Sequence, residues 1–222
     1  MRLKLAVFDV DGTLSDSQAH IHGAMSLAFA TAGLPAPSLA QVLEIVGLSL
    51  PLAVARLAPD LPPEERSQIV ECYKHSYFTQ RAAQPAPLYP GAAEMLARLG
   101  ARPDWLMGVA TGKSRRGLTH LLGHYGLAGH FVTTQVADDH PSKPHPAMLL
   151  AALAETGVAA TDAVMIGDTT YDMEMGRNAG LRTIAVSWGY HPVAALLAAG
   201  ADRLVTDFTA LEAALDDLMG GA

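Results

Sequence analysis

The chain has 222 residues, of which half are hydrophobic and 17% are charged, and its formal net charge is −7. This length suits one domain with an insertion or two small domains, and the composition is typical of a globular chain with an ample core. The acidic balance and the lack of a Lys/Arg block argue against a nucleic-acid partner, although a local cation site can still bind a small anion.

The sequence carries no signal for a membrane or for secretion. No apolar run is as long as a membrane span, and the apolar stretch near the N-terminus stops at Asp9, before it reaches the length of a signal-peptide core. The single cysteine, Cys72, excludes an internal disulfide and fits a reducing compartment. We therefore expect a cytoplasmic protein without a membrane partner.

Short apolar runs alternate with helical patterns along most of the chain, which is typical of β-α-β units and predicts a parallel sheet. The predicted strands are Leu3–Val10, Trp105–Ala110, Phe131–Thr133, Val164–Gly167, Thr183–Ser187 and Arg203–Val205. The helices predicted among them are Ala92–Leu99, Arg115–His124, Ala147–Thr156, Asp172–Asn178, Val193–Ala198 and Leu211–Met219. The expected fold class is α/β, with a Rossmann-like three-layer core.

The segment from residue 16 to residue 87 has a different pattern, because it contains no convincing strand. Its predicted helices, separated by Gly and Pro, are Ser17–Ala32, Leu39–Val46, Leu52–Leu57 and Pro63–Arg81. We expect an α/β core made of residues 1–15 and 88–222, and a helical module of residues 16–87 inserted after the first strand.

Two aspartates follow the first predicted strand. Side chains two residues apart on a strand share a face, so Asp9 and Asp11 are expected together at its carboxyl end, where ligands bind in open α/β sheets. Two neighbouring carboxylates repel each other, and a bound cation relieves that repulsion. The alternative, in which one of them only caps the following turn, leaves the other unexplained.

A second acidic pair follows the predicted strand Val164–Gly167. Asp168 stands at the strand end and Asp172 about one helical turn further on. Carboxylates from two strand ends supply the hard oxygen ligands that Mg²⁺ prefers. The alternative for Asp168 is an ordinary helix N-cap.

Two candidate phosphate-binding segments lie in the second half of the chain. Thr111 and Gly112 follow the predicted strand Trp105–Ala110, and a hydroxyl with backbone N–H groups at such a turn can bind phosphate. The run Gly112-Lys113-Ser114 is not a P-loop, because Met107 stands where that motif needs glycine. Lys143, between Pro141 and Pro144, is the second candidate.

These motifs, in this order, resemble the haloacid dehalogenase-like hydrolase superfamily over the whole chain. The four matching runs are Phe8–Leu14, Thr111-Gly112-Lys113, Lys143-Pro144, and Gly167-Asp168-Thr169 with Asp172. The inserted helices and the run from Gly167 to Gly180 resemble the phosphoglycolate phosphatase-like branch, in which the insert is a cap over the catalytic core.

The resemblance implies a role for each residue. Asp9 would be the nucleophile that forms an aspartyl-phosphate, and Asp11 the general acid and base. Mg²⁺ would be held by the Asp9 carboxylate, the Asp11 main-chain carbonyl and Asp168, with Asp172 behind it or bound through water. Thr111, Gly112 and Lys143 would bind the phosphate oxygens.

The resemblance also implies a reaction, the hydrolysis of a small phosphorylated metabolite, with phosphoglycolate as the first candidate. Asp11 favours phosphate chemistry, since the carbon-attacking dehalogenases of the superfamily lack an aspartate there. A phosphomutase similar to beta-phosphoglucomutase, a pyrophosphatase, a nucleotidase and a non-catalytic module that binds only Mg²⁺ and an anion stay open as alternatives. The sequence leaves open whether the protein is a monomer or a homodimer.

Overall fold

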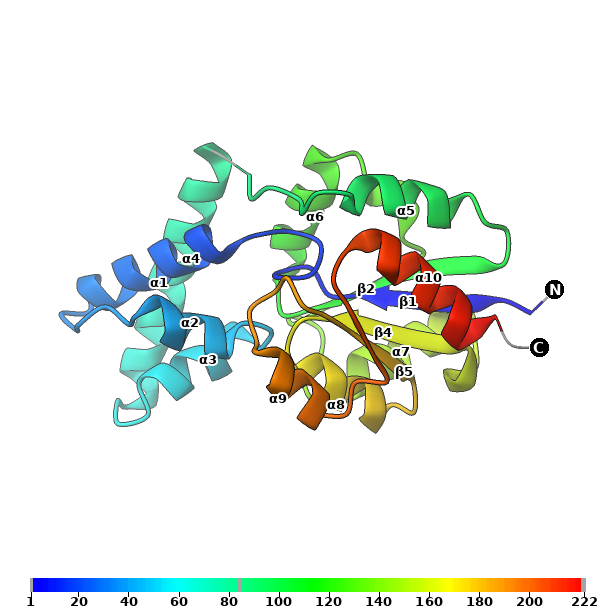
Figure 1. Cartoon of the computed structure of the whole chain (residues 1–222). Coiled ribbons are helices and arrows are strands. Elements are labelled where there is room, and N and C mark those ends of the chain that lie inside the picture. The colour runs from blue at the N-terminus through cyan, green and yellow to red at the C-terminus, as the bar shows by residue number, and fades with distance from the viewer. Residues whose placement is uncertain (1, 84, 221–222) are drawn as a thin grey trace.

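The computed structural model describes residues 2–83 and 85–220, with side chains for all of these except residues 80–83. Six strands form one parallel sheet in the order β3-β2-β1-β4-β5-β6 (Figure 1). The strands are β1 Lys4–Phe8, β2 Trp105–Thr111, β3 Thr133–Val136, β4 Ala163–Gly167, β5 Arg182–Val186 and β6 Arg203–Val205. The predicted parallel sheet is therefore confirmed.

Helices cover both faces of the sheet. They are α5 Ala92–Gly100, α6 Arg115–His124, α7 Ala147–Thr156, α8 Thr170–Asn178, α9 Val193–Ala198 and α10 Phe208–Met219, with short 3-10 turns at Ala128–His130 and Ala160–Asp162. Alternate residues of β1 face the two helical layers on opposite sides of the sheet. Ala6 and Phe8 pack with α5, α6 and α10, whereas Leu5 and Val7 pack with α7 and α8. This arrangement is the predicted Rossmann-like, three-layer core.

One predicted strand is misplaced. The run Phe131–Thr133 was expected to form it, but β3 begins only at Thr133, which pairs with Gly108 of β2. The Phe131 ring instead packs edge-on against Phe8, at a centroid distance of 6.4 Å, and Val132 is exposed. The prediction followed the apolar residues Phe131 and Val132, which precede the strand, whereas the sequence of β3 itself, Thr-Thr-Gln-Val, is mostly polar.

Four helices between β1 and α5 pack into a separate cluster, which we call the helical module. They are α1 Gln18–Thr31, α2 Leu39–Ile45, α3 Leu50–Leu57 and α4 Pro63–Ala83. The buried residues of α1 recur at helical spacing and form one apolar stripe: Ile21, Ala24, Met25, Ala28 and Phe29. That stripe packs with Val42, Val54 and Ile69 of the other three helices.

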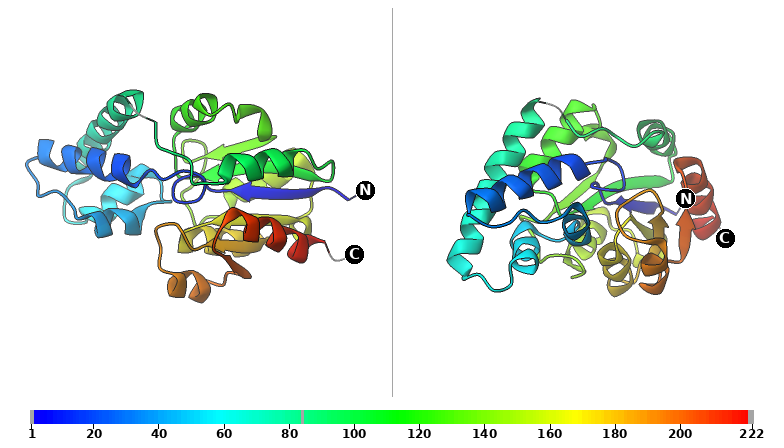
Figure 2. Two further views of the ribbon diagram at one scale, coloured as in Figure 1. Left: turned by 45° about the horizontal axis from the view of Figure 1, so that its top comes forward. Right: turned by 60° about the vertical axis from the view of Figure 1, so that its left-hand side comes forward.

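The helical module lies beyond the carboxyl end of the strands, and both chain termini lie at the opposite end (Figures 1 and 2). Two chain segments connect it to the sheet side by side, since the Asp16 amide donates to the Pro87 carbonyl at 2.8 Å. The predicted domain boundaries, after residues 15 and 87, stay predictions. Among the described residues, no helix is long and apolar enough to cross a membrane.

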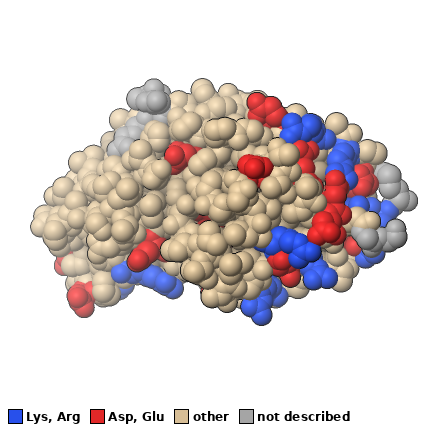
Figure 3. Space-filling model, in the orientation of Figure 1, with Lys and Arg blue, Asp and Glu red and all other residues tan. Residues whose placement is uncertain are grey.

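Charged side chains gather over the end of the molecule that holds the termini, and the helical module shows few of them in the same view (Figure 3). The sequence explains this difference, because no Asp, Glu, Lys or Arg occurs between Asp16 and Glu44.

Candidate active site

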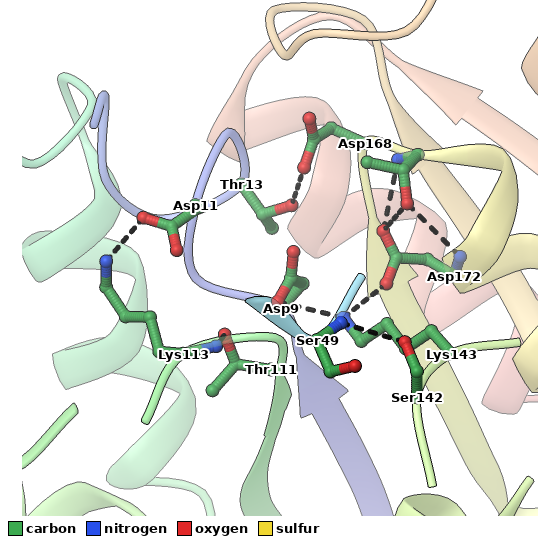
Figure 4. Close-up of polar contacts among 11 residues, drawn as sticks. Asp9, Asp11, Thr13, Ser49, Thr111, Lys113, Ser142, Lys143, Asp168 and Asp172 are labelled. Atoms are coloured by element: carbon green, nitrogen blue, oxygen red, sulfur yellow. Dashed lines mark hydrogen bonds and ion pairs between the residues drawn. The ribbon is translucent and has the colours of Figure 1, made fainter. Parts of the chain in front are cut away.

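Strand register brings the predicted site residues to one edge of the sheet. Phe8, the last residue of β1, pairs with Val109 of β2 and Ile166 of β4. The residues that follow these three strands therefore meet at the carboxyl edge, as the crossover topology of a parallel sheet requires. Asp9, Thr111 and Asp168 all lie there and are almost completely buried (Figure 4).

Asp9 is a buried carboxylate with an incomplete set of partners. The Lys143 ammonium lies 2.9 Å from its Oδ1 atom. Neither carboxylate oxygen accepts a well-formed hydrogen bond from a residue that the structure describes. Burial raises the pKa of Asp9 to about 7; Lys143 opposes this rise, and Asp172 and Asp11 add to it. A buried carboxylate with unused oxygens is suited to bind a cation.

Lys143 is a buried cation between two carboxylates. Its Nζ atom lies 2.9 Å from Asp9 and 2.6 Å from Asp172, and its side chain has no exposed surface. Burial alone would lower the pKa of Lys143, but Asp172 and Asp9 outweigh burial, so the pKa is raised. The lysine therefore stays charged beside Asp9, and its predicted contact with phosphate stays a prediction.

Asp168 and Asp172 have different surroundings. Asp168 accepts hydrogen bonds from the Thr13 hydroxyl at 2.8 Å and the Tyr190 amide at 2.9 Å. Burial, followed by Asp9 and Asp172, raises the pKa of Asp168 well above its ordinary value. Asp172 closes a capping box with Thr169, which is the N-cap of α8. The alternative of an N-cap role for Asp168 is therefore wrong.

These carboxylates pass a simple test for a divalent metal site. Oxygens of Asp9, Asp168 and Asp172 lie within 4.8 Å of one another, all three residues are buried, and Asp9 has oxygens to spare. Three crowded carboxylates share one lysine, which leaves an excess of negative charge. Asp172 is engaged by Lys143 and Thr169, and Asp168 by Thr13 and the Tyr190 amide, whereas both Asp9 oxygens are unused among the described residues. Carboxylate oxygens of this kind can bind a hard cation, and the assignment of Asp9 and Asp168 as side-chain ligands of Mg²⁺ stays a prediction.

Asp11 occupies a separate environment. The strand rule predicts one face for Asp9 and Asp11, but β1 ends at Phe8 and the chain then turns, with Gly12 at φ 85°. The Asp11 side chain points away from Asp9 toward Lys113, whose Nζ atom lies 2.6 Å from Asp11 Oδ1 (Figure 4). Neither aspartate merely caps the turn, since each pairs with its own lysine.

Lys113 is the main site residue that sequence reasoning missed. Its ammonium donates to Asp11 and, at 2.9 Å, to the Tyr77 hydroxyl of α4. Burial would lower the pKa of Lys113, but Asp11 and Tyr77 outweigh burial and raise it. The run Thr111-Gly112-Lys113 was matched to the superfamily motif, but no role was assigned to Lys113 itself; its place directly after Thr111-Gly112 was the signal.

Thr111 and Gly112 lie where the helical module meets the sheet. The buried Thr111 hydroxyl accepts the Lys113 amide at 3.3 Å. A Cβ atom on Gly112 would come within 2.9 Å of the Gly47 and Leu48 carbonyl oxygens, so only glycine permits this close approach. Both residues are at the predicted edge, and their contact with phosphate stays a prediction.

The loop between α2 and α3 reaches the site. The Ser49 amide donates to the Ser142 hydroxyl at 2.8 Å, next to Lys143, and Leu48 is buried in the apolar cluster of the helical module. On the other side, the Tyr171 hydroxyl of α8 donates to the Glu44 carbonyl at 2.9 Å. A cavity of about 710 Å³ lies between the two parts, with Asp9 and Asp11 in its wall.

Fold and site together define a class: a Rossmann-like α/β enzyme with buried carboxylates and lysines at the carboxyl ends of its strands. A family model described as haloacid dehalogenase-like hydrolase matches residues 6–186. The chain belongs to this family, and the resemblance predicted from its motifs is confirmed.

Similar proteins agree with this assignment. The protein named "Probable phosphatase IndB" from Dickeya dadantii (strain 3937) is 32% identical over 219 residues, covering 97% of this chain and 94% of that protein. A phosphoglycolate phosphatase from Yersinia pseudotuberculosis serotype I (strain IP32953) is 31% identical over 209 residues, covering 92% and 89%. The crystal structure of a hydrolase from Pseudomonas syringae superposes with a TM-score of 0.85 at 25% identity, covering 96% and 98%. The prediction of a phosphoric monoester hydrolase of the phosphoglycolate phosphatase-like branch is confirmed.

Proposed function

We propose that this protein is a Mg²⁺-dependent phosphatase that hydrolyses a small phosphorylated metabolite through an aspartyl-phosphate on Asp9. One observation carries the proposal: a buried carboxylate with unused oxygens stands beside a buried lysine and across from a second strand-end carboxylate. These groups supply a nucleophile, a cation for the phosphate and ligands for a metal in one water-poor place.

Asp9 is suited to attack phosphorus because the Lys143 charge lies 2.9 Å from its Oδ1 atom, while neither carboxylate oxygen is committed to a well-formed hydrogen bond among the described residues. In the reaction, an Asp9 oxygen forms a bond to phosphorus while the bond to the leaving oxygen breaks. Water then attacks the phosphorus of the aspartyl-phosphate, which frees phosphate and restores the carboxylate. Lys143 and Thr111, with the backbone at Gly112, would hold the phosphate oxygens.

Asp9, the Asp11 main-chain carbonyl and Asp168 would hold Mg²⁺, with Asp172 behind them. When bound, the ion offsets the repulsion between the carboxylate and the anionic phosphate. Thr13 and the Tyr190 amide fix the Asp168 carboxylate for this task, and Thr169 and Lys143 fix that of Asp172.

Phosphoglycolate is the first substrate to test, because several curated relatives carry the name phosphoglycolate phosphatase. We further propose that residues 16–87 form a cap that closes over a core of residues 1–15 and 88–222 and excludes water. The Ser49–Ser142 and Glu44–Tyr171 hydrogen bonds support this division. The single cysteine and the acidic charge balance support a cytoplasmic protein that acts on a small metabolite and has no nucleic-acid partner.

Removal of the metal tests the proposed function most directly. Phosphate release from p-nitrophenyl phosphate and phosphoglycolate should stop after chelation and return when Mg²⁺ is added, since Asp9 would otherwise attack an unshielded anion. Isomer formation should be absent when assayed in parallel with a sugar phosphate, which separates a phosphatase from a phosphomutase. Full activity in excess chelator, or Mg²⁺ binding with no turnover of any ester, would contradict the proposal.

A second prediction concerns Asp11, which would protonate the leaving oxygen while Lys113 holds its side chain in place. Asp11→Asn should lower kcat for an alkyl phosphate by about 10²-fold or more, because an alkoxide is a poor leaving group without a proton. The loss for p-nitrophenyl phosphate should be below about tenfold, because nitrophenolate leaves unaided. An equal loss on both esters would mean that Asp11 has another role.

A further inference from the structure

The cavity between the helical module and the sheet is much larger than a two-carbon phosphate ester requires. Its volume of about 710 Å³ has room for roughly 24 water molecules at about 30 Å³ each. Pockets for ligands of drug size span about 300–1,000 Å³. The space starts at Asp9 and Asp11 and continues between α4 and the N-terminal end of α6, which gives the leaving group a chamber of its own.

The helical module contributes an apolar, aromatic wall to this chamber. Tyr73 and Tyr77 of α4 stack with a centroid distance of 5.5 Å and an interplanar angle of 13°. Phe78 follows them in the wall, with the Arg116 guanidinium of α6 stacked on its ring at 3.6 Å from the centroid. Met25 and Leu48 border the cavity from α1 and the α2–α3 loop, although both are almost completely buried in the helical module. Flat rings are suited to pack against a flat apolar ligand.

The core contributes a polar wall that includes His140. A chain of hydrogen bonds orients this ring: the Thr133 hydroxyl donates to the Glu155 carboxylate, so its oxygen is left to accept from the Gln135 amide at 2.8 Å. The Gln135 carbonyl oxygen then faces His140 Nε2 at 2.7 Å. Nε2 must therefore carry the proton, and in the neutral ring Nδ1 is the acceptor that can meet a ligand.

The loop that carries His140 is held firmly against α6. The Arg115 amide donates to Asp138 at 2.7 Å, and the Arg115 guanidinium donates to Asp139 and to the Thr134 carbonyl. Thr133 and Gln135 beneath the loop are buried. The position of His140 is thus fixed from two sides, as a residue that selects ligands requires.

We infer that the leaving group of the substrate is larger than two carbons, with a flat apolar body against Tyr77 and Phe78 and a hydrogen-bond donor that reaches His140. This inference rests on the proposed function for the phosphate end and assigns specificity to His140 and to the α4 wall. Lys113 uses two of its three N–H donors on Asp11 and Tyr77, so it holds Asp11 and the α4 wall in position.

Non-hydrolysable phosphonates separate binding from turnover. Calorimetry with Mg²⁺ should show that 2-phenylethylphosphonate binds about tenfold or more tighter than propylphosphonate and 3-phosphonopropionate, the analogue of phosphoglycolate, because its ring is buried against the aromatic wall. A para-hydroxymethyl group on the ring should tighten binding by a further factor of about three to ten. His140→Phe, which keeps a ring but removes the acceptor, should abolish that second gain. Phe78→Ala should reduce the first.

His75→Phe is the matched control, since His75 is exposed on α4 and does not line the cavity; it should retain both gains. Tighter binding of 3-phosphonopropionate than of the phenyl compound, or a hydroxymethyl gain that survives His140→Phe, would overturn the inference. Phosphate release from benzyl phosphate and phosphoglycolate is measured in parallel. If neither ester is hydrolysed while the binding preferences hold, the proposed function fails and the inference about the cavity stands.

Discussion

Asp9→Asn should lower kcat for every phosphate ester by on the order of 10³-fold or more, because an amide cannot supply the attacking oxygen. Asp9 is buried, but asparagine has nearly the same size and shape as aspartate, so the fold should be kept. Phosphate release with p-nitrophenyl phosphate and an alkyl phosphate checks the loss. Substantial retained activity would contradict the assignment of Asp9 as nucleophile.

Stability provides an independent readout for the same variant. In the metal-free protein the pKa of Asp9 is raised from 3.8 to about 7, so its ionised form opposes folding. This cost is absent below about pH 4, grows as the pH rises, and is complete above pH 7. Asp9→Asn should therefore become more stable than the wild type as the pH rises from 5 to 8, as measured by urea unfolding in chelator.

Asp104→Asn is a control in which the ionised carboxylate has the opposite effect on the stability of the fold. Burial would raise the pKa of Asp104, but the Lys4 hydrogen bond, a backbone hydrogen bond and the charges of Arg102 and Lys4 together outweigh burial, and the pKa is lowered. Its ionised form therefore supports folding at pH values above its ordinary pKa, and that support is lost as the pH falls through the lowered pKa. At neutral pH, Asp104→Asn should lose stability and keep activity, because Asp104 lies where β1 and β2 begin, far from Asp9 at their ends.

Lys143→Met should be the most destabilising of these substitutions. It leaves Asp9 and Asp172 buried without their shared cation, and removal of one partner from a buried pair costs about 3–5 kcal/mol. Urea unfolding at pH 8 in chelator measures the loss. Mg²⁺ should recover part of it, because the variant has three unneutralised carboxylates around the metal position.

Lys74→Met is the control for this prediction. Lys74 pairs with Glu71 at 2.7 Å, but both side chains are more than half exposed, and such pairs contribute little. Its unfolding curve should match that of the wild type within about 1 kcal/mol. A similar curve for Lys143→Met would mean that the buried carboxylates are neutral or are solvated by water in the folded protein.

The α/β architecture was readable from the sequence because β1 and β4 are covered on both faces. Such strands are continuous apolar runs, as in Leu5–Phe8 and Val164–Ile166, and the pattern marks them directly. Strand β3 was misplaced because its sequence, Thr-Thr-Gln-Val, is mostly polar and lacks this apolar pattern. The start of α10 was also set three residues late, since its N-cap, Asp207, accepts the Ala210 amide and was not used as a signal.

The sequence by itself determined which residues stand at the ends of the strands: Asp9, Thr111 and Asp168 follow apolar runs whose carboxyl ends must share one edge in a parallel sheet. Only the tertiary structure decided their partners. Lys143 lies between Asp9 and Asp172, Asp11 is turned toward Lys113, and a hydrogen-bond chain orients His140. Local pattern places a residue on an element, whereas ion pairs and burial depend on segments far apart in the sequence, such as the end of β1 and the loops that carry Lys113 and Lys143, which meet only when the sheet assembles. The cavity takes its shape only when the helical module packs against that sheet.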